Sequence, residues 1–441
     1  MRRINLFYAI SLLFSSTWAF ADPGVREDWS LHYQLTAIGQ GDPEFHSPYR
    51  GPLSLSPDGE IRETVSTTLF LGRRLWQGGE LYIDPEITQG KGLSNSQGIA
   101  GFPNGEATHA GLMQSSLLQR YFIWNNIARA YLRQTFNLSD TYEHVDSGQN
   151  QLAQDQATSR IVVRAGKLSA VDIFDNNQYS NDPRTQFLNW ALITNGAWDY
   201  PADAKGYTNG LTLEYIQPSY AIKWGSFMEP KAANSAHLDS HWSQGPIGEA
   251  IELEKPYTVY NHPGKVRLLA FANHAHMGKY KEAINSSNVD ITESRKYRFK
   301  YGVGLNMEQE ITQDLGAFMR LGWNDGKTET WAFTEIDKTA SLGLSLKGTS
   351  WSRGDDTVGL AGFINGLSSV HRKYLQDGGV GFIVGDGRLN YNYEKGSEIY
   401  YDYHLPKGFS ITFDYQLIFD PGYNADRGPV SVFSGRIHYE F

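Results

Sequence analysis

Residues 433–441, FSGRIHYEF, alternate apolar and polar side chains along the whole stretch. The apolar parity holds Phe433, Ile437, Tyr439 and Phe441, and the polar parity holds Ser434, Arg436, His438 and Glu440. A period of two is that of a β-strand with two unlike faces. Residues 409–419 and 399–405 repeat the pattern, again with large aromatic side chains on the apolar face. Successive strands of this kind favour a transmembrane β-barrel over a soluble sandwich.

The composition supports the same fold class. The mean hydropathy is -0.45, yet aromatic residues make up 13% of the chain and glycine occurs 45 times. A polar chain rich in aromatics fits a barrel that is apolar outside, polar inside and ringed by aromatic girdles. After Ala21, no apolar run approaches the ~20 residues that a membrane-spanning helix needs. We therefore expect an all-β, antiparallel transmembrane barrel.

The N-terminal residues read as a secretory signal, with Arg2 and Arg3 before the apolar stretch Leu6–Phe14 and a small-x-small cleavage site at Ala19–Ala21. We expect residues 1–21 to be a signal peptide and residues 22–441 to form one barrel domain. The chain has no cysteine and so neither disulfides nor thiolate metal ligands. An exported protein of this composition suits the outer membrane of a bacterial envelope.

Short and long links alternate between the expected strands. The short links lie at Gln77–Gly79, Gln217–Ser219, His262–Gly264, Thr312–Asp314, Arg353–Asp355 and Pro406–Gly408. The long links lie at Gln40–Ile61, Gly90–Asn126, Ser169–Lys205, Glu229–Gly248, His276–Tyr297, Asp325–Lys338, Asn365–Lys395 and Asp420–Pro429. Tight periplasmic turns and long outer loops alternate in this way in outer-membrane barrels. The count predicts about 16 strands, which leaves room for an aqueous channel.

One link departs from this alternation. Asn137–Thr158 stands where a short periplasmic turn is expected, yet it is long, polar and rich in Gln and Asp. We interpret it as a floppy insertion.

The polar parity of the strands predicts which side chains face the pore. It places Asp84 and Glu86 inside with Glu80, and Arg129, Arg133 and Arg164 inside on the strands that follow. Further on, it also places Lys223, Arg267, Lys300 and Arg320 inside; alternation is ambiguous at Leu268, Leu269 and Phe271. The result is a basic arc beside an acidic strip, able to hydrogen-bond polar solutes. The alternative is that these charges only pair with one another.

The third long link carries the candidate solute-binding residues. Asp182-Pro183 is a plausible helix start, and the link is too apolar and amide-rich to float in solvent. We expect it to fold inward as a constriction. Aromatic rings stack on sugar CH faces and polar side chains bind hydroxyls, which suggests Arg184, Asn189, Trp190, Asn195 and Trp198. The alternative is that the rings only fasten the loop to the barrel wall.

Other chemistry is weakly signalled. His274 and His276 could share a strand face as a metal pair, but no carboxylate partner is evident nearby. Gly-x-Ser-x-Gly is absent and no spacing makes a catalytic triad visible. We expect no catalytic residues, metal or cofactor. The formal charge of -9 without a basic run argues against a nucleic-acid partner.

Several long runs resemble the OprB-type carbohydrate-selective porins. They are Phe45–Tyr49, Leu75–Tyr82, Gly101–Ala107, Tyr131–Phe136, Asp182–Asp199, Thr328–Phe333 and Asn424–Pro429. The resemblance covers nearly all of the chain after residue 21. It implies a sixteen-stranded barrel with an arginine-containing eyelet that passes sugars by diffusion.

Together these observations predict a passive, sugar-preferring porin whose partners are carbohydrates and outer-membrane lipid, with self-association into a homo-oligomer left open. One alternative is a general or anion-leaning pore. The other is a barrel that serves as a scaffold for surface-polysaccharide assembly or for an outer-membrane enzyme.

Overall fold

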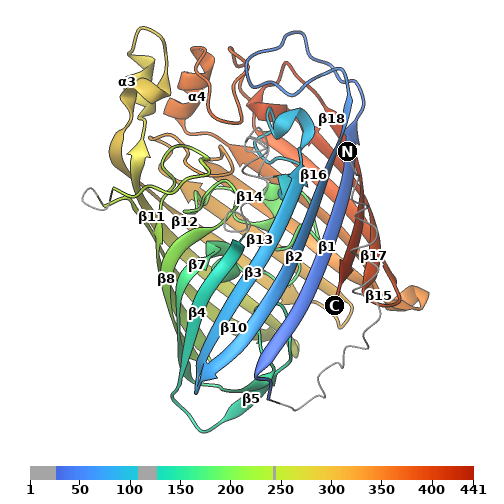
Figure 1. Ribbon diagram of the computed structural model, residues 1–441. Coiled ribbons are helices and arrows are strands. Elements are labelled where there is room, and N and C mark those ends of the chain that lie inside the picture. Colours follow the sequence, from blue (N-terminus) through green and yellow to red (C-terminus); the bar gives the residue numbers. More distant parts are fainter. Residues whose placement is uncertain (1–25, 108–126, 242–244) are drawn as a thin grey trace, which may run out of the picture.

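A computed structural model of the chain describes residues 26–107, 127–241 and 245–441; the expected signal peptide lies outside these ranges. In the described part, sixteen antiparallel strands form a closed barrel (Figure 1). The ring closes where β1 pairs with β18, with Leu35 opposite Tyr439. The predicted fold class and strand number are confirmed. Within the same residues, no helix is long and apolar enough to cross a membrane.

The strands follow the chain order around the barrel. They are β1 (Trp29–Asp42), β2 (Glu60–Trp76), β3 (Gly79–Gly90), β4 (Ile127–Asn137), β7 (Arg160–Leu168), β8 (Thr208–Gln217), β9 (Tyr220–Met228), β10 (Ile247–Val259), β11 (His262–Met277), β12 (Lys296–Glu310), β13 (Leu315–Asn324), β14 (Lys338–Gly348), β15 (Arg353–Gly366), β16 (Glu394–Leu405), β17 (Phe409–Phe419) and β18 (Val430–Glu440). A separate two-stranded sheet pairs β5 (Tyr142–Val145) with β6 (Gln154–Ala157). The α-helices are α2 (Trp190–Ile193), α3 (Tyr280–Ile284) and α4 (Ser369–Gln376), and short 3-10 turns are η1 (Leu93–Asn95), η2 (Gly105–Ala107), η5 (Ala170–Asp172), η7 (Ile291–Ser294), η8 (Thr349–Trp351) and η9 (Pro421–Tyr423).

The strands have the two unlike faces that their alternation predicts. Phe413 on β17 is 67% exposed on the outer face, whereas its neighbours Thr412 and Asp414 are buried inside. On β11 the outer face takes Leu268, while Leu269 and Phe271 point inward. Alternation fails on β11 because these two apolar side chains pack against loops inside the barrel, where they join a buried hydrophobic cluster.

The two ends of the barrel differ as expected. Short turns join the strands at one end, and the long links with α3 and α4 gather at the other (Figure 1). Two short turns are displaced from the predicted positions. One is at Tyr260-Asn261, where both residues have positive φ as a tight hairpin requires, and the other spans Thr349–Ser352. We call the ends the long-loop end and the short-turn end.

The prediction of a floppy insertion after Asn137 is wrong. The segment forms the β5–β6 hairpin, drawn at the short-turn end in Figure 1. Leu152 is wholly buried, and the Ala153 N–H donates to the carboxylate of Glu27 over 2.8 Å. The polar side chains of this segment are ordered by partners on the barrel wall. A local sequence pattern cannot reveal such partners, so the composition alone suggested disorder.

The long link that follows β7 folds into the barrel, as predicted. Charged side chains on the wall hold its backbone. Arg436 on β18 donates to the carbonyls of Pro183 and Gln186 over 2.8 and 2.7 Å, and Arg320 on β13 donates to those of Ser180 and Leu192, both over 2.7 Å. We refer to residues 169–207 as the inward loop.

The helix expected at Pro183 does not form. Residues 182–186 make a turn in which the Asp182 carbonyl accepts from the N–H of Gln186. The helix α2 begins at Trp190, and Asn189 caps it by accepting from the N–H of Ala191 over 2.9 Å. The helix begins after Asn189 and not at Asp182-Pro183, because the N–H groups of Leu188 and Asn189 donate to the buried carboxylate of Glu398.

Candidate functional site

A cavity of about 410 Å³ lies inside the barrel, beside the inward loop. Four parts of the chain contribute to its lining. The wall supplies Phe70, Glu86, Arg129, Tyr131, Arg164 and Leu168; the link after β3 supplies Gly105 and Glu106; the β5–β6 hairpin supplies Gln149 and Asn150; the inward loop supplies, among others, Asp172, Asp182, Arg184, Trp190, Tyr200, Lys205 and Tyr207. We call this space the central cavity.

Arg129 on β4 is held by a fork of two hydrogen bonds. Its Nε and Nη2 each donate to the carboxylate of Asp172 over 2.6 Å. Its Nη1 lies 3.4 Å from Oδ2 of Asp84 on β3, and the guanidinium stands over the ring of Tyr207 at 5.3 Å. A planar guanidinium fixed in this way presents its remaining donors in a set direction. Asp84 and Arg129 meet as the predicted acidic strip and basic arc require.

Arg184 belongs to the inward loop and reaches back to the wall. Its Nη2 donates to Glu86 over 3.0 Å, and its Nε lies 3.0 Å from Oε1 of Glu106. Tyr207 donates its hydroxyl to the other oxygen of Glu86 over 2.8 Å. Burial alone would lower the pKa of Arg184, but the carboxylates of Glu106 and Glu86 outweigh it and raise that pKa above its ordinary value. Arg184 is therefore a fixed positive charge at the cavity.

Arg133 and Arg164 stand opposite each other on β4 and β7. Arg133 lies 3.7 Å from Glu80, and Arg164 forms an ion pair with Glu214. Of the two, Arg164 lines the central cavity and Arg133 does not. Arg129, Arg133, Arg164 and Arg184 are thus all paired with carboxylates, as the alternative states, but three of these four still border the cavity.

The other predicted inward cations serve a different purpose. Lys223, Arg267, Lys300 and Arg320 point inward as expected and are buried. Lys300 lies 3.2 Å from Asp199, and Arg320 lies 3.1 Å from Asp175, both at the inward loop. None of these four is among the residues that line the central cavity. The basic arc is therefore divided between the cavity and the anchoring of the loop.

Three candidates of the inward loop, Asn189, Asn195 and Trp198, make contacts away from the central cavity. Asn189 is fully buried and donates to the Gly101 carbonyl over 2.8 Å, besides capping α2. Asn195 donates to the Leu321 carbonyl on β13 over 3.4 Å, and Trp198 packs edge-on against Phe174 of the same loop at 6.2 Å. None of the three borders the central cavity. The hydrogen bonds of Asn189 to Gln416 and of Asn195 to Leu321 favour the alternative that these residues fasten the loop to the wall.

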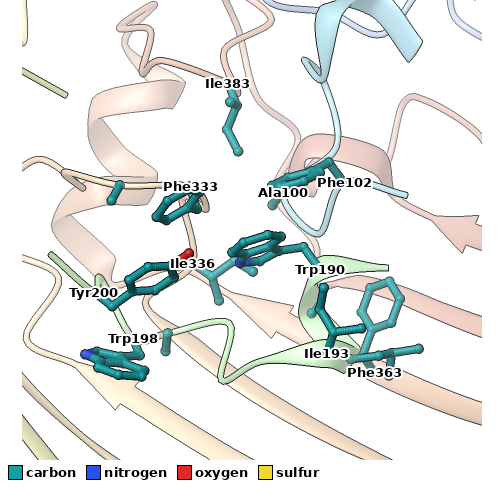
Figure 2. Close-up of a cluster of buried hydrophobic side chains, with 14 of the residues drawn as sticks. Ala100, Phe102, Trp190, Ile193, Trp198, Tyr200, Phe333, Ile336, Phe363 and Ile383 are labelled. Carbon is teal, nitrogen blue, oxygen red and sulfur yellow. The ribbon is translucent and has the colours of Figure 1, made fainter. Parts of the chain in front are cut away.

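Trp190 differs from Trp198 because it borders the cavity while it also packs in the loop. Its ring stacks between Phe102 at 5.1 Å and Phe333 at 4.9 Å, and Tyr200 stacks on Phe333 at 4.4 Å. Figure 2 shows the rings of Phe102, Trp190, Phe333 and Tyr200 as one group, with Trp198 below Tyr200. The cluster unites the inward loop with links that precede β4 and follow β13. It holds Trp190 in place at the edge of the cavity.

Several lining residues were not predicted from the sequence. Glu106 falls in one of the runs that resemble the porin family, and Asp172 begins the inward loop, so these two could have been suspected. Lys205, Tyr207 and the hairpin pair Gln149 and Asn150 had no pattern to mark them. They lie in irregular segments, where side-chain direction does not follow a fixed period.

The histidine pair faces away from the pore. His274 stacks on the lipid-facing Phe299 with ring centroids 4.4 Å apart, and its Nδ1 lies 2.8 Å from the Gly245 carbonyl. In the part of the chain that the structure describes, no three His, Cys, Asp or Glu side chains are grouped to hold a metal ion.

Comparisons with known proteins agree with this architecture. A family model described as carbohydrate-selective porin, OprB family, matches residues 53–441. The high-pH structure of OprB from Pseudomonas putida superposes with a TM-score of 0.68 at 16% identity over 94% of each chain. The low-pH structure of that protein gives a TM-score of 0.47 at 12% identity over 94% of this chain and 93% of that one. No protein with a curated description matches the chain.

Proposed function

The chain belongs to the OprB family of carbohydrate-selective porins, and from this we propose that the central cavity is the constriction through which sugars cross the bacterial outer membrane. The single observation that carries the proposal is the meeting of Arg129, Arg164 and Arg184 with carboxylates in one cavity of the lumen. Family and fold point to a channel and not to an enzyme. We infer passive diffusion without a chemical step.

The pairing of the charges suits a neutral, hydroxyl-rich solute. Each guanidinium has five N–H donors, and Arg129 and Arg184 use only some of them in the contacts to Asp172, Asp84, Glu86 and Glu106. Unused donors and the lone pairs of the carboxylates are then available to sugar hydroxyls. Because the charges already neutralise one another, an ion gains little by replacing a partner. The cavity therefore favours polar neutral solutes over anions.

Apolar contacts complement these polar groups. Phe70, Trp190 and Tyr200 border the same cavity, and aromatic surfaces accept the CH faces of a sugar ring. Binding at such a site must stay weak, since conduction requires a solute to leave as readily as it enters. The carboxylates that pair with the arginines keep sugar binding weak, because a sugar hydroxyl must compete with a carboxylate for each guanidinium donor.

The orientation of the barrel follows from its two ends. We infer that the long-loop end faces outward and the short-turn end faces the periplasm, as in other outer-membrane barrels. A solute would then meet the inward loop first and the β5–β6 hairpin last.

Liposome swelling tests the proposal directly. Monosaccharides and disaccharides are expected to enter faster than neutral solutes of matched size, and saturating sugar is expected to reduce the single-channel current in planar bilayers. Equal rates for sugars and matched solutes would favour a general pore. A barrel with no conductance and no solute entry would instead favour a scaffold for surface-polysaccharide assembly or an enzyme.

A further inference from the structure

The β5–β6 hairpin continues the β4 and β7 strands beyond the short-turn end and turns back into the barrel. Its arms pair in four positions, from Tyr142 opposite Ala157 to Val145 opposite Gln154. Residues 146–151, which we call the tip, reverse at a bridge between Gly148 and Gln151. Asn150 has a φ of 57°, in the left-handed region that asparagine tolerates better than most residues.

The tip reaches strands that are not its sequence neighbours. Ser147 contacts the His32 ring on β1 at 3.0 Å, and Gln149 donates to Gln34 on β1 and to Glu440 on β18 over 3.1 and 3.3 Å. These strands lie beyond β3 and β2 in the order of the barrel. The tip therefore extends along the inner wall from β4 and β7 as far as β18.

Two parts of the hairpin are held differently. At its base, Leu152 is buried, and Gln154 bonds both Glu80 and Arg74 on the wall over 2.7 and 3.0 Å. At its tip, the side chains of Gln149 and Asn150 make only amide hydrogen bonds, that of Asn150 to Asp84 over 2.9 Å. A sugar hydroxyl can replace a side-chain amide in a hydrogen bond to a carboxylate or to another amide.

The tip borders the same cavity as the arginines. Gln149 and Asn150 line the central cavity together with Arg129, Arg164 and Arg184. The hairpin stands at the opposite end of the barrel from α3 and α4 (Figure 1). The inward loop and the hairpin thus approach the cavity from its two sides.

We propose that Gln149 and Asn150 form the exit half of the solute site and set the size limit of the sugars that leave it. The proposal rests on the proposed function, because it concerns solutes that already occupy the central cavity. Asn150 links the tip to the arginines, since Asp84 accepts from both Asn150 and Arg129. A sugar that binds Arg129 therefore lies within reach of the tip amides.

Substitution tests the size limit. The double variant Gln149→Ala with Asn150→Gly removes both amides, and glycine keeps the positive φ available. Gln151→Ala is the matched control, because the Gln151 side chain donates to the Asp146 carbonyl within the tip and does not line the cavity. In liposome swelling, trisaccharide entry is expected to rise severalfold in the double variant while monosaccharide entry changes little. Trisaccharide entry equal to that of the wild type would overturn the proposal.

Cysteine labelling tests the position of the tip, because the natural chain has no cysteine. A sulfonate-bearing methanethiosulfonate reagent should reduce the current of the Gln149→Cys protein, and saturating glucose should slow the labelling. Asp155→Cys is the control, because Asp155 lies on β6 with its side chain 69% exposed, and this variant should keep its current. One outcome would overturn this inference alone: glucose reduces the wild-type current, but the reagent leaves the current of the Gln149→Cys protein unchanged and glucose does not slow its labelling. If glucose never reduces wild-type current, the proposed function fails and this inference with it.

Discussion

The Nη2 atom of Arg184 on the inward loop lies 3.0 Å from Oε2 of Glu86 on β3. This contact joins the loop to the wall at the edge of the central cavity. Glu86 also accepts from Thr68 over 2.8 Å and from Tyr207, so its position is set from three directions. A fixed carboxylate beside a fixed guanidinium gives the cavity a strong local field with little net charge.

Replacing Arg184 by glutamine should unbalance that field. Glu86 and Glu106 would keep their negative charge without the guanidinium, and the cavity would attract cations. We expect the reversal potential in a salt gradient to shift toward cation selectivity, and the shift to shrink at high salt as charges are screened. Arg372→Gln is the control, because Arg372 on α4 stacks on Tyr391 outside the cavity. An unchanged reversal potential would remove Arg184 from the constriction.

Arg164 and Arg133 provide a matched comparison on adjacent strands. Arg164 borders the cavity and Arg133 does not. Because a hydrogen bond from a charged donor is worth roughly 1.5–3 kcal/mol, Arg164→Ala should weaken the block of current by sugar about tenfold or more. Arg133→Ala should leave the sugar block near the wild-type value. Titration of single-channel current with sugar measures both, and equal effects of the two variants would contradict this assignment.

Arg436→Ala should loosen the inward loop. Arg436 is almost fully buried, and it satisfies the carbonyls of Pro183 and Gln186 next to Arg184. Each lost charged hydrogen bond costs roughly 1.5–3 kcal/mol, so the loop should no longer hold its position against the wall. We expect a larger and noisier single-channel current together with a weaker preference for sugars over matched solutes. A quiet current of wild-type size would mean that the other anchors are sufficient.

Strand periodicity made the barrel predictable, because on each strand one face meets lipid and the other meets water or loops. Glu80, Asp84, Glu86, Arg129 and Arg164 all face inward as their parity required. The alternation along a strand could not, however, distinguish a side chain that lines the cavity from one that fastens the inward loop to the wall. Arg320 and Arg164 have the same periodic signal, yet one fixes the loop and the other borders the cavity.

The loops were less predictable because tertiary contacts decide their conformation. Asn189 was expected to bind sugar, but the buried carboxylate of Glu398 takes its backbone N–H and fixes it as a helix cap. The polar segment after Asn137 became an ordered hairpin because of partners on β1, β3 and β18. Such partners are distant in sequence, and no local pattern reports them.

Glu229, directly after β9, is a buried carboxyl group with an unusual environment. It is 1% exposed, and within the described residues neither side-chain oxygen has a hydrogen-bond partner. Burial, with the nearby charge of Asp199 as a smaller cause, raises the pKa of Glu229 well above its ordinary value of 4.5. At a pH just above 4.5, Glu229 therefore keeps its proton more readily in the folded protein than in the unfolded chain.

This proton predicts how stability depends on pH. Because the pKa of Glu229 is higher in the folded protein, its contribution to the free energy of unfolding is fully present below the unfolded pKa of 4.5. That contribution is lost as the pH rises toward the folded pKa, by up to about 1.4 kcal/mol per pH unit. Glu229→Gln keeps the shape and stays neutral at every pH. Its thermal midpoint in detergent should match the wild type in acid and exceed it increasingly toward neutral pH. Parallel curves for the two proteins would show that Glu229 is ionised in the folded barrel.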